Sequence, residues 1–373
     1  GQLFLAVIQM IVVPLVIASV IRGLAASENL EQLRQLGLVV TGFFIVTTAI
    51  AAFIGLWIAG LLGPGEGLTG TLQGITPASN APEAAPVIPG AEDLPQALIG
   101  LLPGNPLSSM VQGEMLQVVL FSMIVGVALV SMPPVQSRPL LDLLGSLQQV
   151  CMTVVRWAML LAPVAVFGLM ARLTSQIGLD ALISMAFYVV TVVLGLILML
   201  GVYLVLLYVF ARQSPFEFLR ATRELLLLAF STSSSAAVMP LSIKTAEESL
   251  HVRASISQFV IPLGATINMT GTALYQGVAA MFLAQVYGIE ISLGGMLLIV
   301  AMAVGAAVGS PGTPGVGIVI LAMVLSTVGI PPEGIALIMG VDRILDMCRT
   351  SVNVAGDVVA AKLMDGWVTA GSS

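Results

Sequence analysis

The last long apolar segment of the chain carries charged and amide side chains that share one helical face. Residues 342–357 read DRILDMCRTSVNVAGD. With a turn of about 100° per residue, an arc of about 80° contains Asp342, Asp346, Arg349, Asn353 and Asp357. A charge in the middle of a bilayer costs ~2.5–3.5 kcal/mol even on the most lenient scale, so such residues face a protein interior or water. The spacing therefore predicts a solute path along this face.

The residue types on this face suit an anionic solute together with a cation. Arg349 can hold a carboxylate through a two-pronged set of N–H donors, and Asp346 can accept hydrogen bonds from an ammonium group. Asn353 and Asp357 offer the oxygen ligands that hard cations such as Na+ prefer. Asp342 lies toward the outer end and is predicted to be an interfacial group. The alternative is that these charges neutralise one another in a purely structural network.

Two apolar segments must position this face, and both are interrupted by residues that do not continue a helix. Segment 225–243 contains STSSS at 231–235, and segment 291–332 contains GSPGTPGVG at 309–317. Each half is too short to cross ~30 Å at ~1.5 Å per residue. Because irregular backbone is tolerated at membrane depth only inside protein or beside water, we predict two re-entrant hairpins. A packing interface of small residues and a plain turn are the respective alternatives.

A third polar stretch lies in the middle of the segment 254–289. Residues 264–272 read GATINMTGT. Glycine, threonine and asparagine in mid-segment predict an unwound stretch whose backbone carbonyls can coordinate a cation. Thr and Asn also hold neighbouring helices together, so this pattern alone is weak evidence for a cation site. The two broken segments and the charged face strengthen that interpretation.

The composition requires lipid as the main solvent. The chain has 373 residues, of which 58% are hydrophobic and 9% charged, and its mean hydropathy is +1.07. Soluble domains contain about 25% charged residues. A net charge of −6 without a basic block argues against nucleic acid, and the single histidine argues against a catalytic or metal-binding His.

Lysine and arginine counts predict the topology. The segment 63–113 contains neither residue and is predicted to lie outside, whereas 212–224 and 244–253 are predicted to lie inside. The first hairpin then enters from inside and the second from outside, which is an inverted repeat of the kind that surrounds transporter substrate sites. Alternatively, 291–332 crosses twice as an ordinary helical hairpin. The apolar start of the chain predicts a missing first helix.

These elements, in this order, resemble the dicarboxylate/amino acid:cation symporter family, which includes the glutamate transporters and their archaeal aspartate-transporting relatives. The likeness covers essentially the whole chain and is carried by GQLFLAVIQMIVVPLVIASVIRG, LLPGNP, the serine-rich tip, PLGATINMTGTALYQG, the second tip and LDMCRTSVNVAGD. It implies an all-α multi-pass membrane protein with the glutamate-transporter-like fold, two re-entrant helical hairpins and an inverted hairpin-helix repeat.

The resemblance also implies the activity and the assembly. A homotrimer in the plasma (cell inner) membrane, in contact with lipids, would transport aspartate, glutamate or a C4-dicarboxylate with Na+ and/or H+ as the coupling ion. The movement would be elevator-type alternating access, without enzymatic activity, cofactor or nucleic-acid partner. Open alternatives are a cation-coupled neutral amino acid transporter, an anion-conducting channel of the same fold and an intramembrane serine enzyme, although no Lys or His lies in a plausible base position near 231–235.

The resemblance divides the chain into scaffold and transport parts. The scaffold would comprise a helix in 1–34, an extracellular loop and helix in 63–146, and a helix in 147–180. The transport part would comprise the helices 35–62 and 181–211 and the core 212–365, followed by a tail at 366–373. The core would contain a hairpin at 215–250, a helix at 254–289, a hairpin at 291–332 and a helix at 334–364.

Position by position, the resemblance assigns ligands to this sequence. The substrate would contact Ser234, Ser235, Thr272, Gly312, Thr313, Gly317, Asp346, Arg349, Thr350 and Asn353. Arg349 would hold the side-chain carboxylate and Asp346 the amino group. Two Na+ sites would be formed by Gly264, Thr266, Asn268, Met269, Ala307, Val308, Ser310, Asn353 and Asp357. A third site would involve Thr47, Thr48 and Thr270.

Several residues depart from the family pattern. Thr270 stands where the family usually has Asp, Phe44 where Tyr is frequent, and Ala307 where many members have Ser. Ser233 and Met347 occupy the two positions at which members place an additional arginine. Because the loss of a carboxylate weakens a hard-cation site, we expect the third Na+ site to be doubtful, and fewer coupling ions or proton coupling to be open possibilities.

Overall fold

The chain is helical throughout the ranges that the computed structural model describes, with no strand in them. These are residues 10–22 apart from 12, 16 and 19, followed by 31–69, 104–112, 115–177, 180–307 and 316–370. The first half contains α2 (Glu31–Leu62), α4 (Pro106–Gln112), α5 (Met115–Ser131), α6 (Pro134–Ile177) and α7 (Asp180–Phe210). The second half contains α8 (Pro215–Thr232), α9 (Ser235–Lys244), α10 (Ala254–Ile267), α11 (Thr270–Tyr287), α12 (Leu293–Ala307), α13 (Val316–Thr327) and α14 (Ile335–Ala370).

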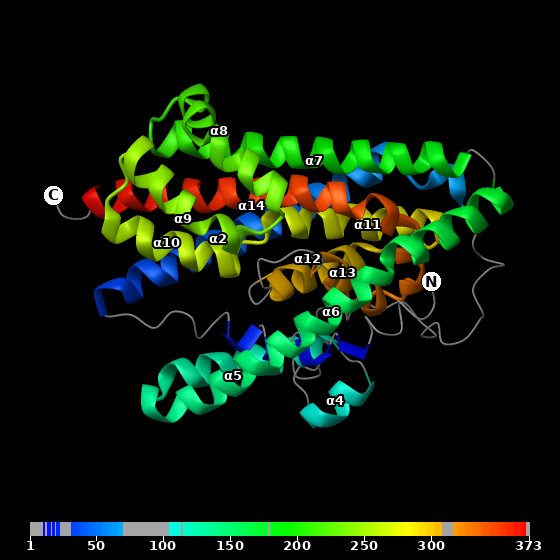
Figure 1. The fold of residues 1–373 in the computed structure, drawn as a ribbon, viewed down its shortest axis with the longest axis horizontal. Coiled ribbons are helices and arrows are strands. Elements are labelled where there is room, and N and C mark those ends of the chain that lie inside the picture. The colour runs from blue at the N-terminus through cyan, green and yellow to red at the C-terminus, as the bar shows by residue number, and fades with distance from the viewer. Residues whose placement is uncertain are drawn as a thin grey trace.

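Helix α14 is surrounded by other helices along most of its length. It packs against α7, α8, α10 and α11, and in Figure 1 it lies between α7 and the α10–α11 pair. Helix α11 is buried on all sides, with every residue but Gln285 in the interior. This explains why its sequence is apolar all round rather than amphipathic. Helix α6 crosses the view diagonally from α5 and also contacts α14.

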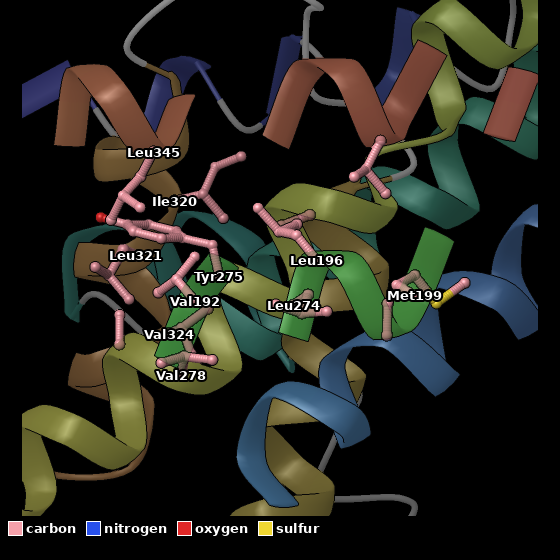
Figure 2. Close-up of a cluster of buried hydrophobic side chains, with 14 of the residues drawn as sticks. Val192, Leu196, Met199, Leu274, Tyr275, Val278, Ile320, Leu321, Val324 and Leu345 are labelled. Carbon is pink, nitrogen blue, oxygen red and sulfur yellow. The ribbon is translucent and has the colours of Figure 1, made fainter. Parts of the chain in front are cut away.

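The apolar core lies where α7, α11, α13 and α14 meet. Figure 2 shows side chains of all four helices in one cluster, namely Val192, Leu196, Met199, Leu274, Tyr275, Val278, Ile320, Leu321, Val324 and Leu345. Tyr275 belongs to this cluster and also contacts the charged face of α14, described below. The core therefore holds α11, α13 and α14 in a fixed arrangement beside the charged residues.

Two described helices are long and apolar enough to cross a membrane, Gly37–Leu62 within α2 and Ile183–Phe210 within α7. Both expose large apolar side chains, including Phe53 and Trp57 on α2 and Ile197 on α7. The other long apolar segments are divided into shorter helices. Segment 254–289 forms α10 and α11, whereas segment 291–332 contains α12 and α13, which pack against each other.

The predicted break in the first hairpin is confirmed. Helix α8 ends at Thr232, Ser233 adopts a left-handed conformation with a φ of 51°, and α9 begins at Ser235. The Ser234 hydroxyl caps α9 by accepting a hydrogen bond from the Ala237 amide at 3.2 Å. Serine is a favoured residue at this cap position. Helices α8 and α9 pack against each other, as a hairpin requires.

The predicted unwound stretch is also confirmed, and it is short. Helix α10 ends at Ile267 and α11 begins at Thr270, so only Asn268 and Met269 leave the helical conformation. The backbone of Asn268 is extended, with a φ of −85° and a ψ of 97°. This conformation places the Asn268 side chain against α14, where the site described below is formed.

Three predicted boundaries are wrong. The division between 63–146 and 147–180 falls inside α6, which is continuous from Pro134 to Ile177. The break lies instead at Met132 and Pro133, because a proline disfavours helix in the residue before it and fits the first helical position itself. Helix α2 begins at Glu31 rather than at 35, and α14 continues to Ala370, so residues 366–370 are helical rather than a tail.

Candidate functional site

The predicted polar face of the last helix is buried inside the protein. Its five residues lie on one side of α14, and each is at most 8% exposed: Asp342, Asp346, Arg349, Asn353 and Asp357. Arg349 is the largest fully buried side chain among the described residues. Because isolated charges are costly to bury, the contacts of these side chains determine what the site can bind.

Arg349 is held by two carboxylates of its own helix and by one aromatic ring. Its Nη1 lies 3.1 Å from Asp342 Oδ1, and its Nη2 lies 2.8 Å from Asp346 Oδ1. The guanidinium carbon lies 4.0 Å from the centroid of the Tyr275 ring, in cation–π geometry. Its Nε is buried and has no hydrogen-bond partner among the described residues. The Nε–H group is therefore available to donate a hydrogen bond to an acceptor outside the described residues.

The prediction that Asp342 is only an interfacial group is wrong. Asp342 is buried and paired with Arg349, seven positions further along the same helix face. Tyr275, on α11, lies between the helices and shields this pair. Asp346 also lies 3.9 Å from Arg343 Nη1, whose side chain is mostly exposed. With Asp357, the face carries three carboxylates and one guanidinium, so its formal charge is −2 when all four are ionised.

The second hairpin reaches this arginine at its second helix. A Cβ atom added to Gly317 would lie 3.0 Å from Arg349 Nη2 and 3.1 Å from Nη1, so the first turn of α13 packs directly on the guanidinium. Glycine at this position leaves the space that the guanidinium occupies. Gly317 and Arg349 are therefore in contact, and a role of Gly317 in substrate binding stays a prediction. Four other residues predicted to bind the substrate or Na+ lie outside the described residues, namely Val308, Ser310, Gly312 and Thr313.

A second group of polar contacts surrounds Asp357, about two turns further along α14. Asn268 Nδ2 donates to Asp357 Oδ1 and to the Asn353 carbonyl, both at 2.8 Å. Asn353 Oδ1 accepts from the Gly271 amide at 2.7 Å. Gly264 faces the Asp357 carboxylate so closely that a side chain there would collide with Oδ1. The residues predicted to bind one cation, from α10, the helix break and α14, therefore meet at one place.

The residues of the doubtful third cation site are neutral and hydrogen-bonded. Thr270 Oγ1 donates to Asn268 Oδ1. Thr47 and Thr48 are buried on α2, and Thr47 Oγ1 donates to the Phe43 and Phe44 carbonyls at 2.9 and 3.2 Å. A contact that the sequence did not suggest comes from α7, where the Tyr203 hydroxyl donates to Thr270 Oγ1 at 2.9 Å. The sequence carried no signal for this contact, since α7 contains three tyrosines and nothing in their spacing distinguishes Tyr203.

The remaining predicted residues have local contacts. Thr350 Oγ1 donates to the Asp346 carbonyl at 2.8 Å, and Thr266 Oγ1 donates to the Pro262 carbonyl at 2.7 Å. Other predicted residues are buried near the helix ends or the α10–α11 break, namely Ser235, Met269, Thr272 and Ala307. The first hairpin is joined to α14 through Ser351 Oγ, which donates to the Leu226 carbonyl at 3.2 Å.

An all-helical chain with apolar outer helices and a buried charged face is, by class, a membrane protein with a polar site in its interior. Comparison with known families gives the same result, since the family model described as "Sodium:dicarboxylate symporter family" matches residues 1–367. The chain belongs to this family. The prediction of the family from its motifs is confirmed, as is the prediction of a transporter rather than an enzyme.

Named relatives cover nearly all of this chain. The proton/glutamate-aspartate symporter of Escherichia coli is 34% identical over 368 residues, covering 98% of this chain and 84% of the relative. The proton/sodium-glutamate symport protein of Bacillus subtilis is 35% identical and covers 98% and 85% of the two chains. The C4-dicarboxylate transport protein of Azorhizobium caulinodans is 33% identical and covers 98% and 82%.

Proposed function

We propose that this protein carries aspartate, glutamate or a C4-dicarboxylate across the cell inner membrane together with Na+ and/or H+. The observation that carries the proposal is the buried Arg349, whose guanidinium meets carboxylates on two sides and whose Nε has no hydrogen-bond partner among the described residues. The relatives named above support both classes of substrate and both coupling ions.

Arg349 suits the recognition of a carboxylate that arrives from water. Asp342 and Asp346 contact Nη1 and Nη2 in the charge-assisted geometry that a substrate carboxylate would also adopt. A substrate carboxylate can bind at Nε and share or replace one of these contacts. Asp346 is then released toward the ammonium group of an amino acid. A dicarboxylate offers no ammonium group, so the contact with Asp346 is not available to it.

The charge of the buried face explains why a cation must accompany the substrate. Three carboxylates and one guanidinium leave a formal charge of −2 on the face when all are ionised. Aspartate or glutamate, with two carboxylates and one ammonium group, adds one further negative charge, and a dicarboxylate adds two. Each uncompensated ion in a protein interior costs several kcal/mol. Na+ or H+ bound near Asp357 lowers this cost, and binding of substrate and cation is therefore coupled.

The fold supports an elevator-type movement within a homotrimer. In this proposal, α8–α9 and α12–α13 are the two re-entrant hairpins, and they form the transport part with α2, α7, α10, α11 and α14. The contact between Gly317 and Arg349 supports a gating role for α12–α13, because substrate at Arg349 would lie beside the first turn of α13. Helices α4, α5 and α6, with the part of the chain before α2, would form the scaffold and the trimer contacts.

The substitution Arg349→Gln tests the carboxylate role. It removes the positive charge and keeps a donor, so the binding of glutamate, aspartate and succinate is expected to weaken by at least ~30-fold, because losing one partner of a buried charge pair costs ~2–5 kcal/mol. Binding is measured with the purified protein by isothermal titration calorimetry. The matched control is Arg343→Gln, on the same helix but exposed, which should bind normally. Unchanged affinity in Arg349→Gln refutes the proposal.

A further inference from the structure

We propose that Tyr203 and Thr270 are positioning residues that hold the Asn268 amide across the cation-binding oxygens of α14, and thereby set the affinity for the cation. This inference rests on the proposed function only in that the oxygens around Asp357 bind Na+. It concerns a tyrosine on α7 that no feature of the sequence brought into the site.

The evidence is a chain of hydrogen bonds that crosses three elements. The Tyr203 hydroxyl on α7 donates to Thr270 Oγ1 at 2.9 Å, and Thr270 Oγ1 donates in turn to Asn268 Oδ1. Asn268 Nδ2 then donates to the Asn353 carbonyl and to Asp357 Oδ1, each at 2.8 Å. All five residues are buried. The chain therefore leads from a hydroxyl on α7 to the carboxylate on α14.

The chemistry of the neighbours fixes the direction of the Asn268 amide. Two oxygen acceptors, the Asn353 carbonyl and the Asp357 carboxylate, lie on one side of it, so its NH2 group must face them. Its carbonyl then faces Thr270, which supplies a hydroxyl proton. Tyr203 completes the chain because its own proton occupies a lone pair of Thr270 and leaves the Thr270 proton for Asn268. Hydrogen bonds in such a series strengthen one another.

The backbone of α10 and α14 packs closely against this series of hydrogen bonds. Gly356, on α14, faces both Asn268 and Tyr203, and a Cβ atom there would lie 2.6 Å from Asn268 Nδ2 and collide with the Tyr203 hydroxyl. Gly264 is equally close to the Asp357 carboxylate. Two glycines therefore allow α14 to approach the tyrosine and the amide. These close contacts restrict the positions of the Asn268 amide and the Tyr203 hydroxyl.

This arrangement has a direct consequence for cation binding. A cation that uses the Asn353 carbonyl and Asp357 competes with the two N–H donors of Asn268 for the same oxygens. Turning the amide removes that competition and brings Oδ1 to the cation, while the NH2 group turns to Thr270. The hydrogen bond from Tyr203 polarises the Thr270 hydroxyl and strengthens its donation to Asn268 Oδ1, which is the bond that the turned amide gives up. Tyr203 therefore favours the closed arrangement and weakens cation binding.

The substitution Tyr203→Phe tests this role in the purified protein. Removing the hydroxyl weakens the hydrogen bond from Thr270 to Asn268 Oδ1 that holds the amide closed, so the Na+ concentration for half-maximal thermal stabilisation should fall by ~3–10-fold, since one hydrogen bond contributes ~0.5–1.5 kcal/mol. Tyr208→Phe, on the same helix but 65% exposed, is the control and should leave this concentration unchanged. An unchanged or higher half-maximal Na+ concentration in Tyr203→Phe overturns the inference.

The substitution Thr270→Asp gives an independent test. A carboxylate cannot donate to Asn268 Oδ1, so the amide must turn, and the added charge favours a further cation beside Thr47. We expect tighter Na+ binding and one more positive charge moved per substrate, measured from the zero-flux membrane potential in proteoliposomes. Unchanged Na+ affinity and charge stoichiometry contradict the inference.

The two proposals fail separately. Na+-dependent uptake by the wild type with neither variant altered refutes the positioning role and leaves the proposed function intact. Stabilisation by Na+ that shifts as expected, without any acidic uptake by the wild type, refutes the proposed function instead. Absence of any stabilisation by Na+ in the wild type and both variants overturns the inference.

Discussion

At the scale of single residues, Arg349 divides its donors between two carboxylates that differ in position. Asp346 is one helical turn away and Asp342 is two turns away, on the side of Tyr275. Both compete with an incoming carboxylate for the same guanidinium. Asp346 has a second use, as an acceptor for a substrate ammonium group. Asp342 has no such use in the proposed binding mode, and its main effect is therefore to oppose an anionic ligand.

The substitution Asp342→Asn is predicted to strengthen substrate binding. It removes a negative charge beside Arg349 and leaves an amide oxygen that can still accept from Nη1. We expect the KM for glutamate and aspartate to fall several-fold, at a cost of ~1–3 kcal/mol in unfolding free energy from the weakened buried pair. Initial rates of uptake at varied substrate concentration measure the first effect, and thermal unfolding measures the second. An increase in KM would show that Asp342 supports the substrate rather than competing with it.

The sequence allowed part of this site to be predicted. The helical spacing of the charged residues depends on one element alone, and it placed all five on the correct face. The burial of Asp342 depends on Tyr275 from another helix, and the contact between Tyr203 and Thr270 joins residues 67 positions apart. Such contacts depend on packing between helices, about which periodicity within one helix carries no information.

At the scale of elements, the interrupted segments were predictable because their breaks have local causes. Ser233 and Ser234 form a left-handed residue and a cap, and Pro133–Pro134 separates α5 from α6. The predicted boundary at 146 is wrong because α6 continues without interruption from Pro134 to Ile177. The way in which α2 lies along α11 was not predicted. That contact depends on glycines at which the two backbones approach closely.

The substitution Gly277→Ala is predicted to destabilise the protein at this helix contact. A Cβ atom at Gly277 would lie 2.5 Å from the Ala52 carbonyl oxygen and 3.0 Å from the Leu56 nitrogen, so the two helices must move apart. We expect a loss of ~1–3 kcal/mol, as for other overpacked sites, seen as a lower midpoint of thermal unfolding in detergent. Gly42→Ala on α2, where nothing lies within 4 Å, is the control and should not be destabilised. Equal midpoints for both variants would contradict this packing.

At the scale of the whole molecule, apolar side chains lie on the surface and a group of charged side chains lies in the interior. Helices α2 and α7 present large apolar side chains outward, while α14 carries Asp342, Asp346, Arg349 and Asp357 inside the bundle. The sequence predicted this inversion from its 9% content of charged residues. The side of the membrane on which each loop lies stays a prediction, because the packing of helices does not distinguish inside from outside. The homotrimer stays a prediction because it depends on contacts between chains. The elevator movement stays a prediction because it requires a second arrangement of the same helices.

The most direct test of coupled transport is the uptake of labelled glutamate, aspartate and succinate into proteoliposomes that contain the wild-type protein. An inward Na+ gradient and an inward H+ gradient are imposed separately, and each is then reversed. We predict accumulation of at least one acidic substrate above its external concentration under an inward cation gradient, and net efflux when that gradient is reversed. Flux that only equalises the substrate concentration, with no dependence on either cation gradient, would contradict coupled transport by the buried face of α14.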